Sequence, residues 1–118
     1  MQSYFLVCVR FSLVAKDVVA TLEDMGLGKP LVAANETEAL SRLAELPPGA
    51  AVHLALIEAA PDEFPTSILE TTLDALGTKI VLISDAPGTS LGALRYTVLR
   101  TPFFTDDLID LILGKRPA

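Results

Sequence analysis

Five short runs rich in Val, Leu and Ile recur along the chain, and none shows the strict in-and-out alternation of a half-exposed strand. Runs of this kind are typical of strands that are buried on both faces, as in a parallel sheet. They cover residues 4–9, 30–34, 52–58, 79–84 and 97–100. We therefore predict five strands at these positions.

Helical patterns fill the gaps between these strands. The first pattern places apolar residues on one face at three-to-four-residue spacing, and these are Val14, Val18, Leu22 and Met25. Gly26 then predicts the end of this helix. Asn35 precedes three polar residues, the third of which is Glu38, and this is the pattern of an N-cap with a capping-box acid. A second helix is therefore expected after Asn35, ending before the Pro-Pro-Gly sequence at 47–49.

The second half of the chain predicts two further helices and one weak helical segment. Pro65 fits the first turn of a third helix, because its missing N–H would have no partner there. The buried face of that helix is predicted at Leu69, Leu73 and Leu76. Residues 85–96 contain one proline and two glycines, so any helix there is expected to be short. Thr105 is predicted to cap a last helix, whose apolar residues are Leu108, Ile109, Leu111 and Ile112.

Strands and helices thus alternate throughout the 118 residues, as expected for right-handed crossovers onto a mostly parallel sheet. We expect one α/β domain, a three-layer α-β-α sandwich with helices on both faces of the sheet. In open sheets of this kind, functional residues gather at the carboxyl ends of the strands. The residues expected to meet at that edge are Val9, Arg10, Glu58, Ser84 and Thr101.

Composition narrows the classes of function. The net charge is −6 and Lys and Arg are scattered, so direct nucleic-acid binding is not expected. The longest apolar runs are strand-sized and no leader pattern opens the chain, so we expect a cytoplasmic protein without a membrane span. Cys8 is the only cysteine, and its apolar surroundings favour a buried, inert thiol. His53 has no partner at ligand or catalytic spacing, which favours a structural role.

In the order and spacing of its segments, nearly the whole chain resembles a receiver domain of two-component response regulators. FLVCVRFSLVAKDVVATLEDMG is similar to the first strand, acidic turn and first helix of that family, and AANETEAL to the start of its second helix. VHLALIEAAP resembles the third strand, which ends at the phosphorylated aspartate, and KIVLIS the fourth strand with its terminal Ser or Thr. VLRTPFFTDDLIDLI resembles the Lys-Pro-Phe signature and the last helix. The resemblance implies a flavodoxin-like, doubly wound sheet of order 2-1-3-4-5, a reduced fourth helix, and a single receiver-like domain over residues 1–118 with no output domain.

The resemblance also implies family roles for particular positions, and most of them carry a different residue here. In receivers an aspartate accepts the phosphoryl group, two acids help to hold Mg²⁺, and a Ser or Thr and a Lys bind the phosphoryl oxygens. Glu58 stands at the acceptor position, Val9 and Arg10 at the acidic pair, and Thr101 at the Lys. Ser84 alone matches the pattern. The resemblance therefore indicates a degenerate receiver, of the pseudo-receiver type.

These replacements predict that neither a metal nor another cofactor is bound. Mg²⁺ requires oxygen ligands in near-octahedral geometry, whereas Val9 offers no oxygen and Arg10 places a fixed positive charge in the same place. Glu58 is one methylene longer than Asp, and a displacement of about 1 Å can cost about 100-fold in rate. Without the metal and the Lys, phosphoryl transfer loses most of its charge stabilisation. We expect no enzymatic phosphotransfer by the ordinary route.

The charges that remain suggest an ion pair between Arg10 and Glu58 that holds the site in one signalling conformation. Two simpler interpretations stay open, a solvated acid at Glu58 and a surface Arg10 whose stem lies on apolar neighbours. Ser84 could cap the turn that follows it instead of binding phosphate, because Asp and Pro come next in that turn. Thr101 precedes a proline, and its hydroxyl could bond locally.

A protein partner is the expected route to output. In receivers the face made by the fourth helix, fifth strand and fifth helix contacts partners, and Tyr96, Phe103 and Phe104 fall on that face here, although at least one of these rings is expected in the core. The leading hypothesis is a signalling domain that binds a histidine kinase, a phosphotransfer protein or another regulator, with a homodimer as a further option. The alternatives are an atypical phosphoacceptor in a phosphorelay and a small-molecule-binding module at the carboxyl edge of the sheet. No Gly-rich phosphate loop follows the first strand.

Overall fold

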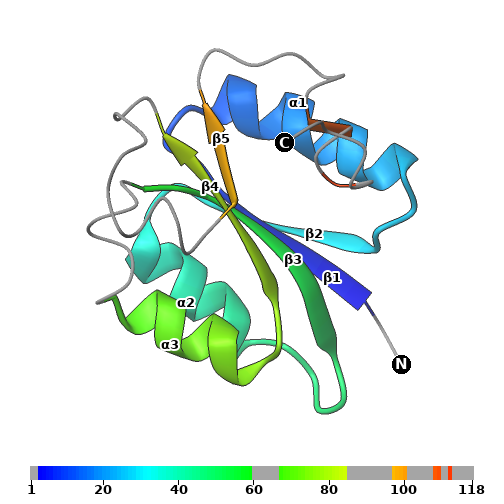
Figure 1. Cartoon of the computed structure of the whole chain (residues 1–118). Helices are drawn as coiled ribbons and strands as arrows, with labels where there is room; N and C mark the ends of the chain where they lie inside the picture. The colour runs from blue at the N-terminus through cyan, green and yellow to red at the C-terminus, as the bar shows by residue number, and fades with distance from the viewer. Residues whose placement is uncertain (1–2, 60–66, 85–96, 101–107, 110–111, 113–118) are drawn as a thin grey trace.

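A computed structural model describes residues 3–59, 67–84, 97–100, 108–109 and 112 of the chain. Its centre is a five-stranded parallel sheet of order β2-β1-β3-β4-β5 (Figure 1). The strands are β1 (Ser3–Cys8), β2 (Lys29–Ala33), β3 (Ala51–Glu58), β4 (Lys79–Ser84) and β5 (Thr97–Arg100). The predicted strands and their order are therefore confirmed, with boundaries that differ by at most one residue.

Helices cover both faces of the sheet, as predicted. Helix α1 (Ser12–Asp24) lies on one face, and α2 (Glu36–Ala44) and α3 (Ile68–Ala75) lie side by side on the other (Figure 1). The Asn35 side chain accepts a hydrogen bond from the Glu38 N–H at 2.9 Å, so the predicted cap of the second helix is confirmed. Helix α1 ends at Asp24, and Gly26 follows with a positive φ of 74°. The sheet is the middle layer of a three-layer sandwich.

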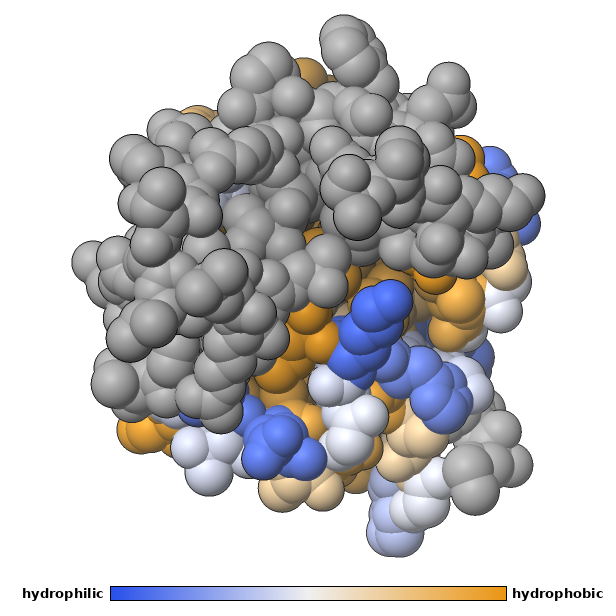
Figure 2. Space-filling view, viewed as in Figure 1, coloured by the Kyte–Doolittle hydropathy of each residue, from blue (hydrophilic) through white to orange (hydrophobic). Residues whose placement is uncertain are grey.

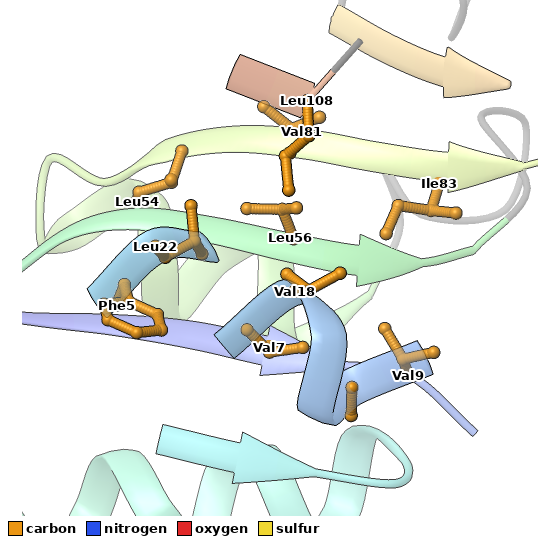
Figure 3. Close-up of a cluster of buried hydrophobic side chains, with 11 residues drawn as sticks. Phe5, Val7, Val9, Val18, Leu22, Leu54, Leu56, Val81, Ile83 and Leu108 are labelled. Carbon is orange, nitrogen blue, oxygen red and sulfur yellow. The ribbon is translucent and has the colours of Figure 1, made fainter. Parts of the chain in front are cut away.

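Two apolar clusters hold the layers together, one on each face of the sheet. In the first, Val18 and Leu22 of α1 lie against the central strands, at residues such as Phe5 and Leu56 (Figure 3). Leu108, which is helical and almost fully buried, belongs to the same cluster. The second comprises Leu6, Cys8, Ala33, Ala39, Leu43, Val52, Ala55, Ile57, Leu69, Leu73 and Leu82. Residues 5–8 of β1 and 54–57 of β3 alternate between the two clusters, which is why these central parts of the strands are apolar on both faces.

The third helix begins and ends differently from the prediction. Ser67 is its N-cap, with an extended backbone and a side chain that accepts from the Glu70 N–H. Pro65 lies outside the described residues, and it precedes this cap, so its placement in the first turn was wrong. Leu69 and Leu73 are buried as predicted, but Leu76 is 45% exposed because the helix has ended at Ala75.

The last helix is described only in part. Leu108, Ile109 and Ile112 are helical, as predicted. The predicted cap at Thr105 and the segment 85–96 lie outside the described residues. No helix within the described ranges is long and apolar enough to cross a membrane.

Some large apolar side chains remain on the outside of the described structure. Orange surface is visible between hydrophilic side chains in Figure 2. Besides Leu76, these exposed residues are Phe11, Leu13, Val32 and Ile68. Three of the five lie at the start of a helix, next to the carboxyl edge of the sheet.

Gly28 is required where the chain returns from α1 to β2. Its φ is +115°, and a Cβ at this position would overlap the carbonyl oxygen of Ser3. Gly26, two residues earlier, also has a positive φ, but a Cβ there would meet open space. A substitution at either glycine would strain the backbone, because both have a positive φ. Only a substitution at Gly28 would also cause a steric overlap.

We expect Gly28→Ala to lower the free energy of unfolding by at least about 3 kcal/mol, because either β1 or the turn must move to admit the methyl group. The matched control Gly26→Ala should cost only about 1 kcal/mol, the cost of a left-handed backbone without a clash. Urea unfolding of both variants measures the difference. Equal losses would show that Gly28 is not constrained by its contact with β1.

Candidate functional site

The carboxyl edge of the sheet brings together the ends of β1, β3 and β4. Cys8 pairs with Ile57 in the register of β1 and β3, and Glu58 pairs with Ile83 in that of β3 and β4. Glu58 is therefore the last residue of a central strand, and Val9 and Arg10 leave the neighbouring strand beside it. The sequence predicted this meeting of residues from strand ends alone.

Arg10 and Glu58 are in contact. Glu58 Oε1 accepts two hydrogen bonds from Arg10, one from the main-chain N–H at 2.9 Å and one from Nε–H at 3.3 Å. The ion pair expected from the sequence is thus present, although both donors reach the same oxygen, so the pair is not bidentate. The Arg10 side chain is 74% exposed and that of Glu58 is 23% exposed. Glu58 is accordingly not a fully solvated acid.

The main-chain contact gives this pair its geometric importance. An exposed ion pair between side chains alone stabilises a protein by about 0–1 kcal/mol, because both side chains lose freedom and water screens the charges. A carboxylate that accepts a main-chain N–H also fixes the backbone that carries this donor. Glu58 therefore ties the turn between β1 and α1 to the end of β3.

Arg10 also lies near an aromatic ring that the sequence analysis did not single out. Its guanidinium carbon is 5.8 Å from the centroid of the Phe11 ring, within the range of a cation–π contact. Phe11 is the N-cap residue of α1, where it makes no side-chain capping hydrogen bond. An aromatic residue at an N-cap gives no familiar signal, because caps are normally small and polar.

Val9, which the resemblance assigns to one position of the acidic pair, is a core residue. It is 4% exposed and packs in the cluster beneath α1, at the end of β1 in Figure 3. Its main-chain N–H donates to the Ala33 carbonyl at 3.0 Å, which extends the pairing of β1 with β2. The side chain offers the edge no oxygen.

The remaining residues named from the sequence have different outcomes. Ser84 is buried at the end of β4, level with Arg100 of β5. His53 is exposed on β3. The residues that lie outside the described ranges are Tyr96, Thr101, Phe103 and Phe104. Within the described ranges, no group of three or more His, Cys, Asp or Glu side chains could hold a metal ion.

Glu36 has a role at this edge that sequence reasoning missed. Its Oε2 accepts a hydrogen bond from the main-chain N–H of Leu69 at 3.0 Å, so a residue in the first turn of α2 caps the start of α3. An acid at this position is normally explained by the dipole of its own helix. The contact becomes visible only once the fold places the two helices side by side.

Cys8 lies just below the edge and is 5% exposed, so the expectation of a buried thiol is confirmed. Burial is the largest cause of a raised pKa at this thiol, because the thiolate would lose its hydration, and the negative charges of Glu36, Glu38 and Glu58 act in the same direction. Together they raise the pKa from 9.0 to about 11. At neutral pH the residue is a protonated, apolar member of the core.

The raised pKa makes the stability of the fold dependent on alkaline pH. The thiol ionises in the unfolded chain near pH 9 but in the folded protein only near pH 11. The contribution of Cys8 is therefore complete below about pH 9 and is lost as the pH rises toward about 11, with a slope of at most about 1.4 kcal/mol per pH unit. Urea unfolding of the wild type and of Cys8→Ala between these values should show this extra slope only in the wild type. Parallel curves would contradict it.

Comparison with known proteins identifies the fold. No protein-family model matches the sequence, and no curated protein matches it. The structure is similar to that of a response regulator from Thermotoga maritima, which is 18% identical in sequence. The match covers 98% of this chain and 98% of that chain, with a TM-score of 0.72. A response regulator receiver domain protein (CheY-like) from Methanospirillum hungatei JF-1 is 19% identical, with coverage of 97% of this chain and 96% of that chain and a TM-score of 0.64. The chain therefore has the fold of response regulator receiver domains.

Proposed function

We propose that this protein is a degenerate receiver domain that signals through contacts with a protein partner, without Mg²⁺-dependent phosphorylation of its acceptor position. The observation that carries the proposal is the double hydrogen bond from Arg10 to Glu58. It places a cation of the chain itself at the edge where the resemblance locates a metal and its acidic ligands.

The charges at this edge oppose a divalent cation. A metal near Glu58 would have to approach the Arg10 guanidinium, which stays protonated at all ordinary pH values. A metal bound through Oε1 would also have to compete with two N–H donors, one of which belongs to the main chain. Val9 cannot replace the lost ligands, because its side chain is apolar and turned into the core. Mg²⁺ binds poorly where few oxygens are free.

The same contacts oppose phosphorylation. A carboxylate oxygen that accepts two hydrogen bonds is a weaker nucleophile, because its lone pairs are already stabilised. Phosphoryl transfer depends on the exact position of the nucleophile and on cations that neutralise the spreading charge. Here Oε1 of Glu58 is held toward Arg10 by two hydrogen bonds. Thr101 stands where the resemblance expects a Lys. Catalysis of its own phosphorylation is therefore not part of the proposed function.

A fixed conformation is the remaining consequence. The contact joins the β1–α1 turn to the end of β3, so one arrangement of this edge is stabilised whether or not a ligand is present. A domain with one fixed conformation would signal through the partner protein that binds it. The proposed partner is a histidine kinase, a phosphotransfer protein or another regulator in the cytoplasm, and a homodimer is the other arrangement that the proposal allows.

The first test asks whether Glu58 can be modified. We expect incubation with acetyl phosphate and Mg²⁺ to leave the intact mass of the protein unchanged. We also expect beryllofluoride with Mg²⁺ to leave the amide NMR signals of Arg10 and Glu58 in place. A stable adduct at Glu58 would contradict the proposal and favour the phosphoacceptor alternative.

The second test restores the family residues. The variant Val9→Asp, Arg10→Asp, Glu58→Asp, Thr101→Lys should gain Mg²⁺ binding that is measurable by titration calorimetry, because it has three carboxylates at the edge and lacks the guanidinium that contacts residue 58 in the wild type. Glu58→Asp alone should gain none. The matched control Arg10→Gln, Glu58→Gln removes the ion pair without adding acids, and it should bind no metal either.

Because Val9 is buried, the fourfold variant needs a separate measure of folding. Its circular dichroism and thermal unfolding should confirm a folded domain before the titration is interpreted. A version that keeps Val9 and changes only the other three positions still replaces Arg10 by an acid, and it buries no carboxylate in the core. Tight Mg²⁺ binding by the wild type would overturn the proposal whatever the variants do.

A further inference from the structure

Two of the most exposed apolar side chains in the described part of the chain lie directly after Arg10. Phe11 is 62% exposed and Leu13 is 72% exposed. Phe11 is the N-cap of α1 and Leu13 belongs to its first turn, so both are at the carboxyl edge of the sheet. Single exposed apolar residues need no explanation, but here two of them occur within three positions of an exposed Arg at the same edge of the sheet, and this combination favours an interaction surface.

The neighbouring guanidinium is oriented by two contacts. Its Nε–H donates to Glu58, and its carbon lies 5.8 Å from the Phe11 ring. No hydrogen bond joins its terminal NH₂ groups to any residue in the described ranges, and the side chain is 74% exposed. A positioned guanidinium with free donors loses less side-chain freedom on binding than a mobile one.

The charge of the outermost group indicates what this surface would bind. Arg10 projects beyond Glu58, which is only 23% exposed, so an approaching molecule meets the cation first. Helix α1 has no acid in its first turn and no side-chain cap, unlike α2 and α3, so the partial positive charge of its N-terminus adds to the same field. A carboxylate complements both.

The apolar side chains and the net charge restrict the class of partner. A small anion would leave Phe11 and Leu13 uncovered. An anionic membrane would be repelled by a chain of net charge −6. A protein segment with an acid next to an apolar side chain can satisfy all three residues at once, and Arg and aromatic residues commonly contribute most at such contacts.

We propose that Arg10, Phe11 and Leu13 form a docking surface for a partner-protein segment that presents a carboxylate beside an apolar side chain. The proposal rests on the proposed function, in which the domain acts by protein contact, and it names the part of the domain that makes that contact. The Arg10–Glu58 pair then has two effects, since it blocks the metal site and orients the guanidinium toward the partner.

A random-peptide display library, panned on the whole chain in the presence of EDTA, tests this surface. We expect the enriched peptides to share an Asp or Glu beside a large apolar residue. A synthetic peptide of that consensus should shift the amide NMR signals of Arg10, Phe11 and Leu13. Its affinity should fall about tenfold or more for Arg10→Gln and for Phe11→Ser.

Leu76→Ser is the matched control, because Leu76 is also an exposed apolar residue but lies at the other end of a helix. It should leave the affinity unchanged. Since all three substituted side chains are exposed, thermal unfolding should show that the variants remain folded.

Several results would overturn the docking surface. These are peptides without an acidic consensus, binding that Arg10→Gln and Phe11→Ser leave intact, no enrichment over a blank matrix, and self-association of the chain that Leu13→Ser abolishes. None of them involves metal or phosphoryl groups, so the proposed function is tested separately by its own mass and titration measurements. A negative result here with no adduct at Glu58 would mean that contact occurs through another face.

Discussion

The carboxylate of Glu58 and the main-chain N–H of Arg10 form the contact on which the candidate site depends. Its importance is more geometric than energetic. Charged side chains at a surface can separate at little cost, but a hydrogen bond to the main chain fixes the path of the turn that leads into α1. The positions of Arg10, Phe11 and Leu13 follow from that turn. Under the proposed function, this one contact both opposes a metal at the edge and sets the surface that the edge offers to a partner.

Much of the fold could be predicted from the sequence because its local signals agree with each other. The strands of the sheet core are apolar on both faces, Asn35 caps α2, and glycines follow the first and third helices. The errors arose where a local rule had two valid solutions. A proline can open a helix or precede its cap, and Ser67 provides the cap here. Leu76 continues the apolar spacing, yet the helix ends before it.

Only those features of the candidate site that follow from the positions of the strand ends could be predicted from the sequence. Arg10 and Glu58 leave adjacent parallel strands, so their meeting follows from the order of the sheet. The order of the sheet does not predict that both donors of Arg10 reach one oxygen of Glu58, or that one donor is the main-chain N–H, because these details depend on the path of a turn. The link from Glu36 to Leu69 joins residues that are distant in sequence, and it required the packing of two helices. The aromatic neighbour of Arg10 was missed because no local rule places a ring at an N-cap.

A cation that belongs to the chain differs from a bound ion in its thermodynamic linkage. A site that binds Mg²⁺ or a phosphoryl group is stabilised in proportion to the logarithm of ligand concentration, and its conformation can follow that concentration. Arg10 is covalently part of the protein, so its concentration at Glu58 never changes. Under the proposed function, the edge therefore offers partners the same surface under all conditions. Any regulation must then act on the amount of the domain or on its partner, and not on the state of this edge.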